Sequence, residues 1–474
     1  MLLLDDRQRA ELWRELTATI EDYINQVAEL PVAPPIDLTE IRSRLAAFDF
    51  NQSVEPLAAL NFAAKNLRDF QVHTPHPRYF GLFNPAPTAM GIAADALVAA
   101  FNPQLAAWSQ NSFASEVERH LIRAFSSRFG YNQETADGTF CSGGAEANHT
   151  ALICALVRKF PVFAEKGLRG LHQQPVFYVS SQSHHLFIKA ARFCGLGTDA
   201  VREIKTDAQF RMSAPHLAKQ IEIDRASNFA PFFIVATAGT TNGGTIDDLT
   251  TIGAIAAREN QWFHVDAAWG GAAVFVPELR EHLGGIERAD SITFDAHKWL
   301  SVPMGAGIFL TRHREILNET CRITTDYMPR DAVEFGVSDS FTHSMQWSRR
   351  FIGLKVFLSL AVAGWEGYAA VIRHQTAIGD LLRVELEKND WEIVNRTPLP
   401  VVCFRDCKSN KGKTEEFLNE IANKAVISGK AWISLTRLDR ETPVVRACIT
   451  NYRTEESDVQ FLTNLLSDVR SETT

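Results

Sequence analysis

Residues 290–300 read Asp290-Ser291-Ile292-Thr293-Phe294-Asp295-Ala296-His297-Lys298-Trp299-Leu300, which sets a lysine closely behind a short apolar run typical of a buried strand. The ordinary interpretation of such a lysine is that its ammonium reaches water from the strand end. A chemical role is the alternative, because a desolvated amine loses its proton and becomes a nucleophile that can form a Schiff base with an aldehyde cofactor. Lys298 by itself does not decide between the two.

An upstream segment has the same organisation and reads Phe263-His264-Val265-Asp266-Ala267-Ala268-Trp269-Gly270-Gly271. Ligands of parallel sheets bind outside the carboxyl ends of the strands, so Asp266 and Lys298 are expected to project toward one cleft. A pyridoxal phosphate site needs both groups, since the lysine holds the aldehyde carbon and a carboxylate keeps the ring nitrogen protonated, which makes the ring an electron sink. The two residues in this order therefore indicate a pyridoxal phosphate enzyme.

The two segments resemble those of the pyridoxal-phosphate-dependent group II amino acid decarboxylases, which include the aromatic amino acid and glutamate decarboxylases. The resemblance runs from about His76 to near the C-terminus. It implies a type I pyridoxal phosphate fold, like that of aspartate aminotransferase, with a mainly parallel central sheet, an N-terminal helical segment and a small C-terminal α+β domain. It also implies a homodimer with its active site at the subunit interface, and decarboxylation of an L-amino acid to the amine and carbon dioxide.

Composition sets the limits of this interpretation. A chain of 474 residues with 46% hydrophobic residues exceeds one ordinary core. We expect a helical dimerisation segment over 1–75, a large cofactor-binding α/β domain over 76–345 and a small α+β domain over 346–474. The net charge of -8 argues against a nucleic-acid partner. No signal-like start and no uninterrupted apolar run long enough for a membrane span are present.

The seven cysteines are scattered, without a CxxC pair or zinc-ligand spacing. They indicate reduced thiols, a cytoplasmic location and no metal site.

The order of elements is expected to alternate between strands and helices. Apolar residues from Leu12 to Val27 recur at helical spacing, and Thr39 is expected to cap a second helix. Strands are expected at 176–180, 232–241, 263–266, 291–295 and 305–310, with helices between them, which is typical of an α/β domain. Further strands at 391–394, 401–404 and 444–449 alternate with helices at 415–425 and 457–469 in the C-terminal part.

Residues 141–148 are expected to bind the phosphate, because backbone amides at a helix start that carry small side chains suit an anion. The segment is neither GxGxxG nor a Walker loop, which disfavours dinucleotides and nucleoside triphosphates. The resemblance implies Gly143, Gly144 and Ala145 here, although many relatives carry a hydroxyl where this chain has Ala145.

The resemblance also implies that His184, rather than its neighbour His185, stacks over the cofactor ring. Thr240, or Thr241 beside it, and Ala268, Asp295 and His297 complete the predicted cofactor set. Relatives that act on aromatic substrates have asparagine at the position of Asp295, where other members use aspartate.

The resemblance also implies a substrate pocket. Its predicted residues are Leu82, Phe83, Asn84, Ala106 and Arg446. The polar segment from Thr324 to about Thr342 matches a mobile loop that closes the neighbouring subunit's site, and Tyr327 matches the tyrosine that protonates the carbanion after carbon dioxide leaves. The predicted catalytic set is thus Lys298, His184, Asp266 and Tyr327, whereas Arg349 and Arg350 are expected to be structural ion-pair partners.

The side chain of the substrate stays open at this point, with a slight preference for aromatic amino acids over acidic, sulfonated or other ones. Aldehyde-forming relatives commonly carry phenylalanine where this chain has Tyr327, so simple decarboxylation is favoured over an aldehyde synthase. A third alternative is a non-catalytic protein that binds the cofactor, against which the retained catalytic residues argue.

Overall fold

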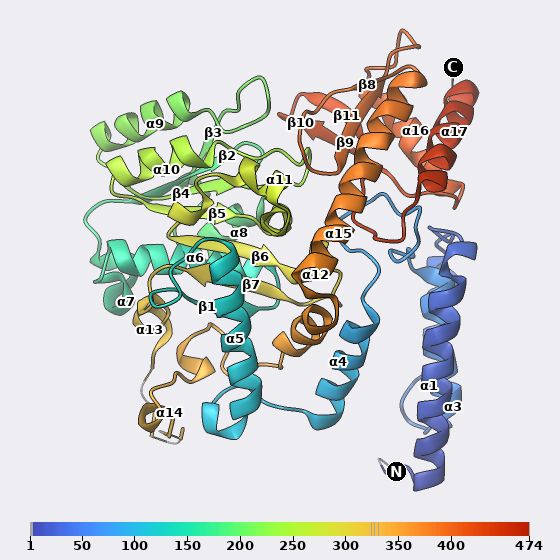
Figure 1. Ribbon diagram of the computed structural model, residues 1–474, viewed down its shortest axis with the longest axis horizontal. Helices are drawn as coiled ribbons and strands as arrows, with labels where there is room; N and C mark the ends of the chain where they lie inside the picture. Colours follow the sequence, from blue (N-terminus) through green and yellow to red (C-terminus); the bar gives the residue numbers. More distant parts are fainter. Residues whose placement is uncertain (1–2, 324, 327, 330, 474) are drawn as a thin grey trace.

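The computed structural model describes residues 3–323, 325–326, 328–329 and 331–473. Figure 1 shows helices α1 and α3 side by side and apart from the large sheet, and the long helix α15 between that sheet and a smaller one. The predicted fold is confirmed: a helical N-terminal segment, a mainly parallel central sheet and a small C-terminal α+β part.

The central sheet has seven strands in the order β1-β7-β6-β5-β4-β2-β3. Strands β6, β5, β4, β2 and β3 are parallel to one another, and β7 is antiparallel to both of its neighbours, β1 and β6. Their bounds are β1 Asp137–Cys141, β2 Pro175–Ser180, β3 Val201–Ile204, β4 Ala230–Thr237, β5 Trp262–Asp266, β6 Ser291–Asp295 and β7 Gly307–Thr311.

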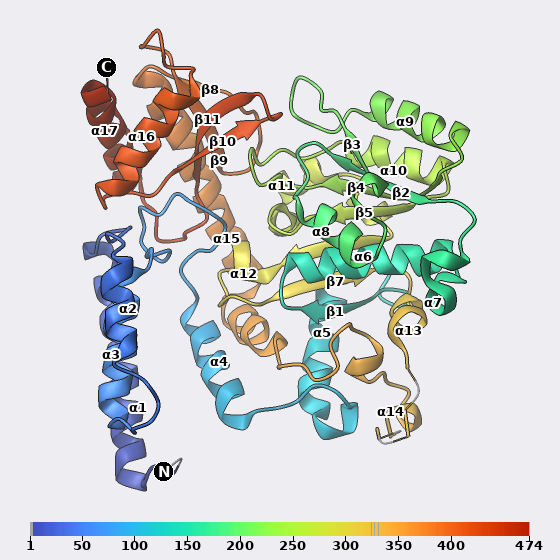
Figure 2. The ribbon, with the colours of Figure 1, turned by 180° about the vertical axis from the view of Figure 1, so that it is seen from behind.

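Helices cover both faces of this sheet, because successive strand side chains point to opposite faces. Phe233 and Val235 of β4 belong to the core under α6 and α8, whereas Ile234 and Ala236 belong to the core under α5, α9 and α10. Figure 1 looks onto the second face, and Figure 2 onto the first. The helices of this part are α4 Ala89–Phe101, α5 Ser112–Arg128, α6 Gly144–Lys159, α7 Phe163–Lys166, α8 Leu186–Phe193, α9 Ala214–Ala226, α10 Leu249–Arg258, α11 Pro277–Arg280, α12 Ala296–Trp299, α13 Ile316–Cys321 and α14 Asp331–Glu334.

The C-terminal part is an antiparallel sheet in the order β10-β11-β9-β8, with helices packed against it. Strand β10 was not predicted, because it is a short edge strand whose residues are mostly half-buried. It turns into β11 through Asp439 and Arg440, both at positive φ, without the glycine that usually signals such a hairpin. The bounds are α15 Gly353–Lys388, β8 Trp391–Ile393, β9 Val401–Asp406, α16 Glu415–Ile427, β10 Ser434–Leu438, β11 Thr442–Cys448 and α17 Glu456–Thr473.

Helix α15 is long and apolar enough, by length and composition alone, to cross a membrane. Its N-terminal half bonds to the α4 region through Ser359 and Lys355, and its C-terminal half lies in the small core with α17. Gly364, at φ 63° and ψ 175°, interrupts the helical geometry between the two halves. A kinked core helix therefore accounts for the same composition.

The N-terminal segment contains α1 Asp6–Gln26, α2 Leu38–Ala46 and α3 Pro56–Phe70. The first helix is confirmed, with Asp5 and Gln8 forming a capping box. The predicted cap of α2 is wrong by two positions, because Asp37 accepts the Glu40 N–H at 2.9 Å and Thr39 lies inside the helix. Helix α3, capped by Glu55, was not predicted.

The structural role expected of the two adjacent arginines is confirmed. Arg349 and Glu118 form a buried ion pair at 2.6 Å, and Glu118 also accepts the N–H groups of Ile352 and Gly353. Arg350 pairs with Asp95 on α4. These bonds fix the entry of α15 against α4 and α5.

Candidate active site

A cavity of about 170 Å³ lies where the carboxyl ends of β4, β5 and β6 meet the start of α6. Asp266 ends β5, and Lys298 follows β6 on the short helix α12, so the parallel-strand argument correctly predicts that both face one cavity. The lining residues are Phe83, Gly144, Ala145, Asn148, His184, Leu186, Thr237, Gly239, Thr241, Asp266, Ala268, Trp269, Asp295 and Lys298.

Lys298 is held by an ion pair inside this cavity. Its Nζ lies 3.0 Å from Oδ2 of Asp295, which is the last residue of β6 and is 1% exposed. Asp295 Oδ1 is buried and has no hydrogen bond from any described residue. His297 lies outside the lining, with its Nδ1 accepting the Ala306 N–H and its Nε2 3.9 Å from Asp295 Oδ2. The lysine amine is thus directed into the cavity by a neighbouring carboxylate.

Asp266 is buried and faces two donors. The Ala268 N–H donates to its Oδ1 at 3.2 Å, and the Asn148 side-chain amide donates to its Oδ2 at 3.2 Å. Burial raises the pKa of Asp266, and attraction to Lys298 opposes that rise. A cationic N–H group bound in the cavity would therefore stabilise the carboxylate, which is what a protonated pyridine ring provides.

His184 reaches the cavity from the turn after β2, and His185 does not line it. The Leu186 N–H donates to Nδ1 of His184 at 3.1 Å, so the neutral ring carries its proton on Nε2. Desolvation by the surrounding protein lowers the pKa of His184, and Asp266 partly opposes this. A neutral imidazole is suited to stack on a flat ring.

The start of α6 fits a phosphate group. Gly144 has no room for a side chain, because a Cβ there would lie 2.7 Å from Asp295 Oδ2 and 3.3 Å from the Ala268 Cβ. Glu146 holds the preceding turn by accepting from the N–H and the hydroxyl of Ser142, at 2.8 Å and 2.7 Å. Gly144 and Ala145 line the cavity at the start of the helix, where the first N–H groups have no acceptor inside the helix.

Replacing Gly144 by alanine is expected to weaken pyridoxal phosphate binding by about tenfold or more, equal to ~1.4 kcal/mol. The new Cβ must displace Asp295, which would disturb its pair with Lys298. Titration of the cofactor-free protein by tryptophan fluorescence measures this effect. Gly143, although predicted to bind the cofactor, does not line the cavity, and Gly143→Ala is the matched control because it keeps the backbone N–H and its Cβ meets His297 at an ordinary 3.6 Å. Equal affinities of the two variants would contradict the geometry.

The predicted substrate residues separate into two groups. Phe83 lines the cavity and stacks on Trp269, with ring centroids 4.4 Å apart. Arg446 lies behind Phe83, 4.9 Å above its ring, is 2% exposed and donates to the Gly81 carbonyl. Its Nε and Nη2 have no hydrogen-bond partner among the described residues. The predicted residues outside the lining are Leu82, which is exposed, Asn84, which accepts from the Tyr79 hydroxyl, and Ala106, which is buried.

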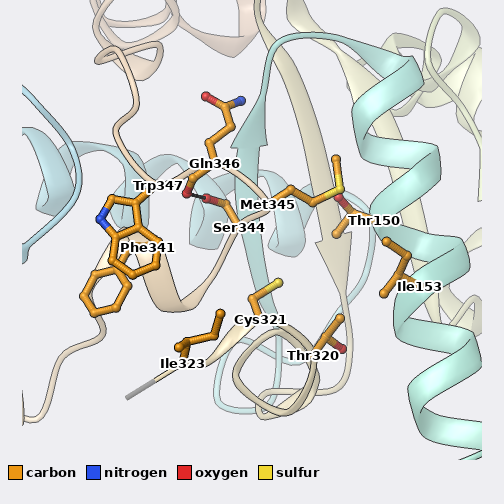
Figure 3. A pocket seen from close by; sticks show the side chains of 10 residues that line it. All are labelled: Thr150, Ile153, Thr320, Cys321, Ile323, Phe341, Ser344, Met345, Gln346 and Trp347. Atoms are coloured by element: carbon orange, nitrogen blue, oxygen red, sulfur yellow. Dashed lines mark hydrogen bonds between the residues drawn. The ribbon is translucent and has the colours of Figure 1, made fainter. Parts of the chain in front are cut away.

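The predictions for Thr240 and Tyr327 have different outcomes. Thr240 does not line it, since its Oγ1 accepts the Thr245 N–H, and Thr241 lines it instead. Tyr327 lies outside the described residues. A second cavity, of about 250 Å³, lies between α6, α13 and residues 341–347 (Figure 3). The side-chain amide of Gln346 donates to Glu146, which connects residues 341–347 to the phosphate-binding turn.

Some residues that line the cavity were not predicted from the sequence, namely Asn148, Leu186, Thr237, Gly239 and Trp269. Asn148 carried a usable signal, because it lies four residues after Gly144 and therefore on the same face of α6.

Comparisons with known proteins identify the family of this chain. Residues 42–406 match the family model described as the pyridoxal-dependent decarboxylase conserved domain. The aromatic-L-amino-acid decarboxylase of Bacillus atrophaeus is 32% identical over 97% of this chain and 94% of its own length. The cysteine sulfinic acid decarboxylase of Mus musculus is 29% identical over 83% of this chain and 82% of its own length.

Solved structures are similar over nearly the whole chain. The crystal structure of mouse CSAD superposes with a TM-score of 0.92 at 25% identity, covering 98% of this chain and 99% of that one. Oryza sativa TDC with PLP and tryptamine superposes with a TM-score of 0.91 at 25% identity, covering 100% of this chain and 99% of that one.

Proposed function

Because the chain belongs to the pyridoxal-dependent decarboxylase family, we propose that it releases carbon dioxide from an L-amino acid with an aromatic side chain and that Lys298 carries its cofactor. The protein is a pyridoxal-phosphate-dependent carboxy-lyase. The amino acid that it uses and the roles of the individual residues are the proposed part.

Each residue around the cavity has a separate proposed role toward the cofactor. When bound, pyridoxal phosphate supplies an aldehyde that bonds to an amine and a ring that accepts the electrons of the breaking bond. Lys298 would supply the amine, the Asp266 carboxylate would accept a hydrogen bond from the protonated ring nitrogen, and the amides of Gly144 and Ala145 would donate to the phosphate. His184 covers one face of the ring. Tyr327 is proposed to return a proton to the α-carbon.

The aromatic lining is the observation that carries the choice of substrate. Phe83, Leu186 and Trp269 form an apolar wall of the cavity, and Trp269 is itself stacked between Phe83 and Trp299. Such a wall favours a flat apolar side chain, since aromatic pairs add about 0.5–1.5 kcal/mol to the burial of their area. The Bacillus atrophaeus relative, named for aromatic amino acids, supports the same choice.

One observation favours an acidic or sulfinic amino acid instead. Arg446 is buried behind Phe83 with Nε and Nη2 unpaired among the described residues, and unpaired guanidinium donors attract carboxylate or sulfinate oxygens. Phe83 would have to turn aside to admit such a group to Arg446. The mouse relative named for cysteine sulfinic acid supports this second candidate.

A homodimer is part of the proposal, with residues 1–75 as its dimerisation segment. Large apolar side chains on α1, α4 and α5 are exposed, among them Trp13 at 51%, Phe101 at 81% and Phe113 at 71%. Exposed apolar surface of this kind is typical of an interface with a partner. Sedimentation of the full chain at micromolar concentration is expected to give twice the mass of the chain.

Carbon dioxide release from aromatic, acidic, sulfinic and diamino L-amino acids tests the function. We expect release from the aromatic group, with the amine as the product and without ammonia or peroxide. Release from sulfinic or acidic substrates only would transfer the assignment to the Arg446 alternative. Ammonia and peroxide beside carbon dioxide would indicate an aldehyde synthase, and a cofactor-bound protein that releases nothing from any group would exclude decarboxylation.

A further inference from the structure

A line of buried hydrogen bonds runs from Asp266 away from the cavity and across β5 and β6. Trp262 Nε1 donates to Ser291 Oγ at 2.8 Å, and Ser291 Oγ lies 2.8 Å from His264 Nδ1. His264 Nε2 lies 2.7 Å from Asn148 Oδ1, and the amide of Asn148 donates to Asp266 Oδ2 at 3.2 Å. His264, Ser291 and Asn148 have no exposed surface.

The chemistry of these groups fixes the direction of every bond. Asp266 accepts, so Asn148 must turn its NH₂ toward Asp266 and its carbonyl toward His264. His264 therefore carries its proton on Nε2, which leaves Nδ1 to accept the Ser291 hydroxyl proton. Ser291 Oγ in turn accepts from the Trp262 indole, which can only donate. Each of these donors and acceptors finds its complement, and reversing one bond would set two like groups against each other.

The surroundings of His264 favour this single arrangement. Its ring stacks on Phe233 at 5.6 Å and meets the edge of Phe187, and burial lowers its pKa to about 3, so that it stays neutral. Thr293 Oγ1, at 3.4 Å from Nε2, is the only other polar side chain bonded to the ring among the described residues, and it lies farther away than Asn148. The nearer Asn148 carbonyl is therefore the acceptor that we assign to Nε2 of His264.

We propose that Asn148 and His264 are positioning residues that hold Asp266 ionised and aimed at the ring nitrogen of pyridoxal phosphate, with Ser291 setting the tautomer of His264. The inference rests on the proposed role of Asp266. Without His264, the Asn148 carbonyl loses its donor, and the amide can flip to accept from Asp266 once that carboxyl is protonated, which disfavours the ionised form. Without Ser291, His264 can move its proton to Nδ1, so that Nε2 accepts from the Asn148 NH₂. The Asn148 carbonyl then faces Asp266, which favours the protonated acid in the same way. The contact between cofactor and protein that depends on this line is the one at the ring nitrogen.

The test compares two ligands of the cofactor-free protein: pyridoxal phosphate, and its analogue in which a C–H group replaces the ring nitrogen. Both keep the aldehyde and the phosphate, so the ratio of their dissociation constants isolates the bond to Asp266. We expect the wild-type protein to prefer pyridoxal phosphate by about tenfold or more, as for a charge-assisted hydrogen bond. His264→Leu and Asn148→Leu should lower this preference at least about fivefold while leaving affinity for the analogue within about twofold.

Conservative variants separate positioning from a general structural role. His264→Gln keeps an N–H near the place of Nε2 and is expected to restore most of the preference. Ser291→Ala should lower it like His264→Leu, and it carries the comparison if the leucine variants do not fold. Thr150 is buried on α6, and its hydroxyl donates to the Glu146 carbonyl. Thr150→Val is the control and should leave the preference unchanged.

Two results would overturn the inference. Equal losses of affinity for both ligands in the leucine variants would mean that these residues only support the fold. A wild-type protein that does not distinguish the two ligands would refute the role of Asp266 itself, and with it the line behind it, whereas carbon dioxide release would still report separately on the function.

Discussion

Lys298→Ala is expected to lower the rate constant of carbon dioxide release by about 10⁴-fold or more, the loss typical of removing a covalent nucleophile. Lys298 is the only lysine that lines the cavity among the described residues, so no other described amine there can take its place. The variant should still bind pyridoxal phosphate through the α6 amides and Asp266, but should release it on dialysis. Turnover with the preferred amino acid and the absorption spectrum before and after dialysis measure both effects.

Lys298→Arg is the matched variant for this experiment. It keeps a cation beside Asp295, which would otherwise be a buried carboxylate that has lost its partner. The arginine is not a useful nucleophile, since its guanidinium stays protonated. We expect it to be as inactive as the alanine variant but more stable to heat. Turnover above one hundredth of the wild-type rate in either variant would assign the covalent role to another amine.

The sequence predicted the centre of the site better than its rim. Asp266 and Lys298 could be brought together because each follows an apolar strand, and parallel strands deliver their carboxyl ends to one edge. That argument depends only on the order of the elements. Whether Thr240 or Thr241 faces the cavity depends on the rotation of a turn, which neither composition nor periodicity encodes.

The misses in the fold have related causes. The strand predicted at 305–310 is β7, residues 307–311. Its antiparallel pairing was not predicted, because an apolar strand has the same period in either direction. The edge strand β10 has a single fully buried residue and hence a weak apolar pattern. Helix α3 is as amphipathic as α1, so its absence from the prediction has no such cause. The line through Asn148 and His264 was missed because its members are far apart in the sequence, and only the packing of α6 on β5 and β6 joins them.

Asp266→Ala is expected to lower the same rate constant by about 10³-fold, in the range of losses seen when a preorganised charge at the reacting group is removed. The carboxylate is the acidic side chain that faces the predicted place of the ring nitrogen, and the positive ring withdraws electrons from the breaking bond. Burial raises the pKa of Asp266, so the carboxylate and the ring proton stabilise each other inside the cavity. Losing the carboxylate leaves the ring nitrogen without a partner that favours its protonated form. The measurement is turnover at saturating substrate with excess cofactor.

Reconstitution with N-methylpyridoxal phosphate distinguishes this electronic role from a role in packing. Its ring nitrogen is permanently positive and needs no carboxylate. With this cofactor, Asp266→Ala should be at least about tenfold more active than with pyridoxal phosphate, since the shorter side chain leaves room for the methyl group. In the wild-type protein the same methyl group would meet the Asp266 carboxylate and should lower activity. Asp266→Asn is the harder case, because the Ala268 N–H and the Asn148 amide both donate to this side chain, and an asparagine would turn its own NH₂ toward one of them. Equal activity of Asp266→Ala with either cofactor would show that the carboxylate orients the ring without supplying its charge.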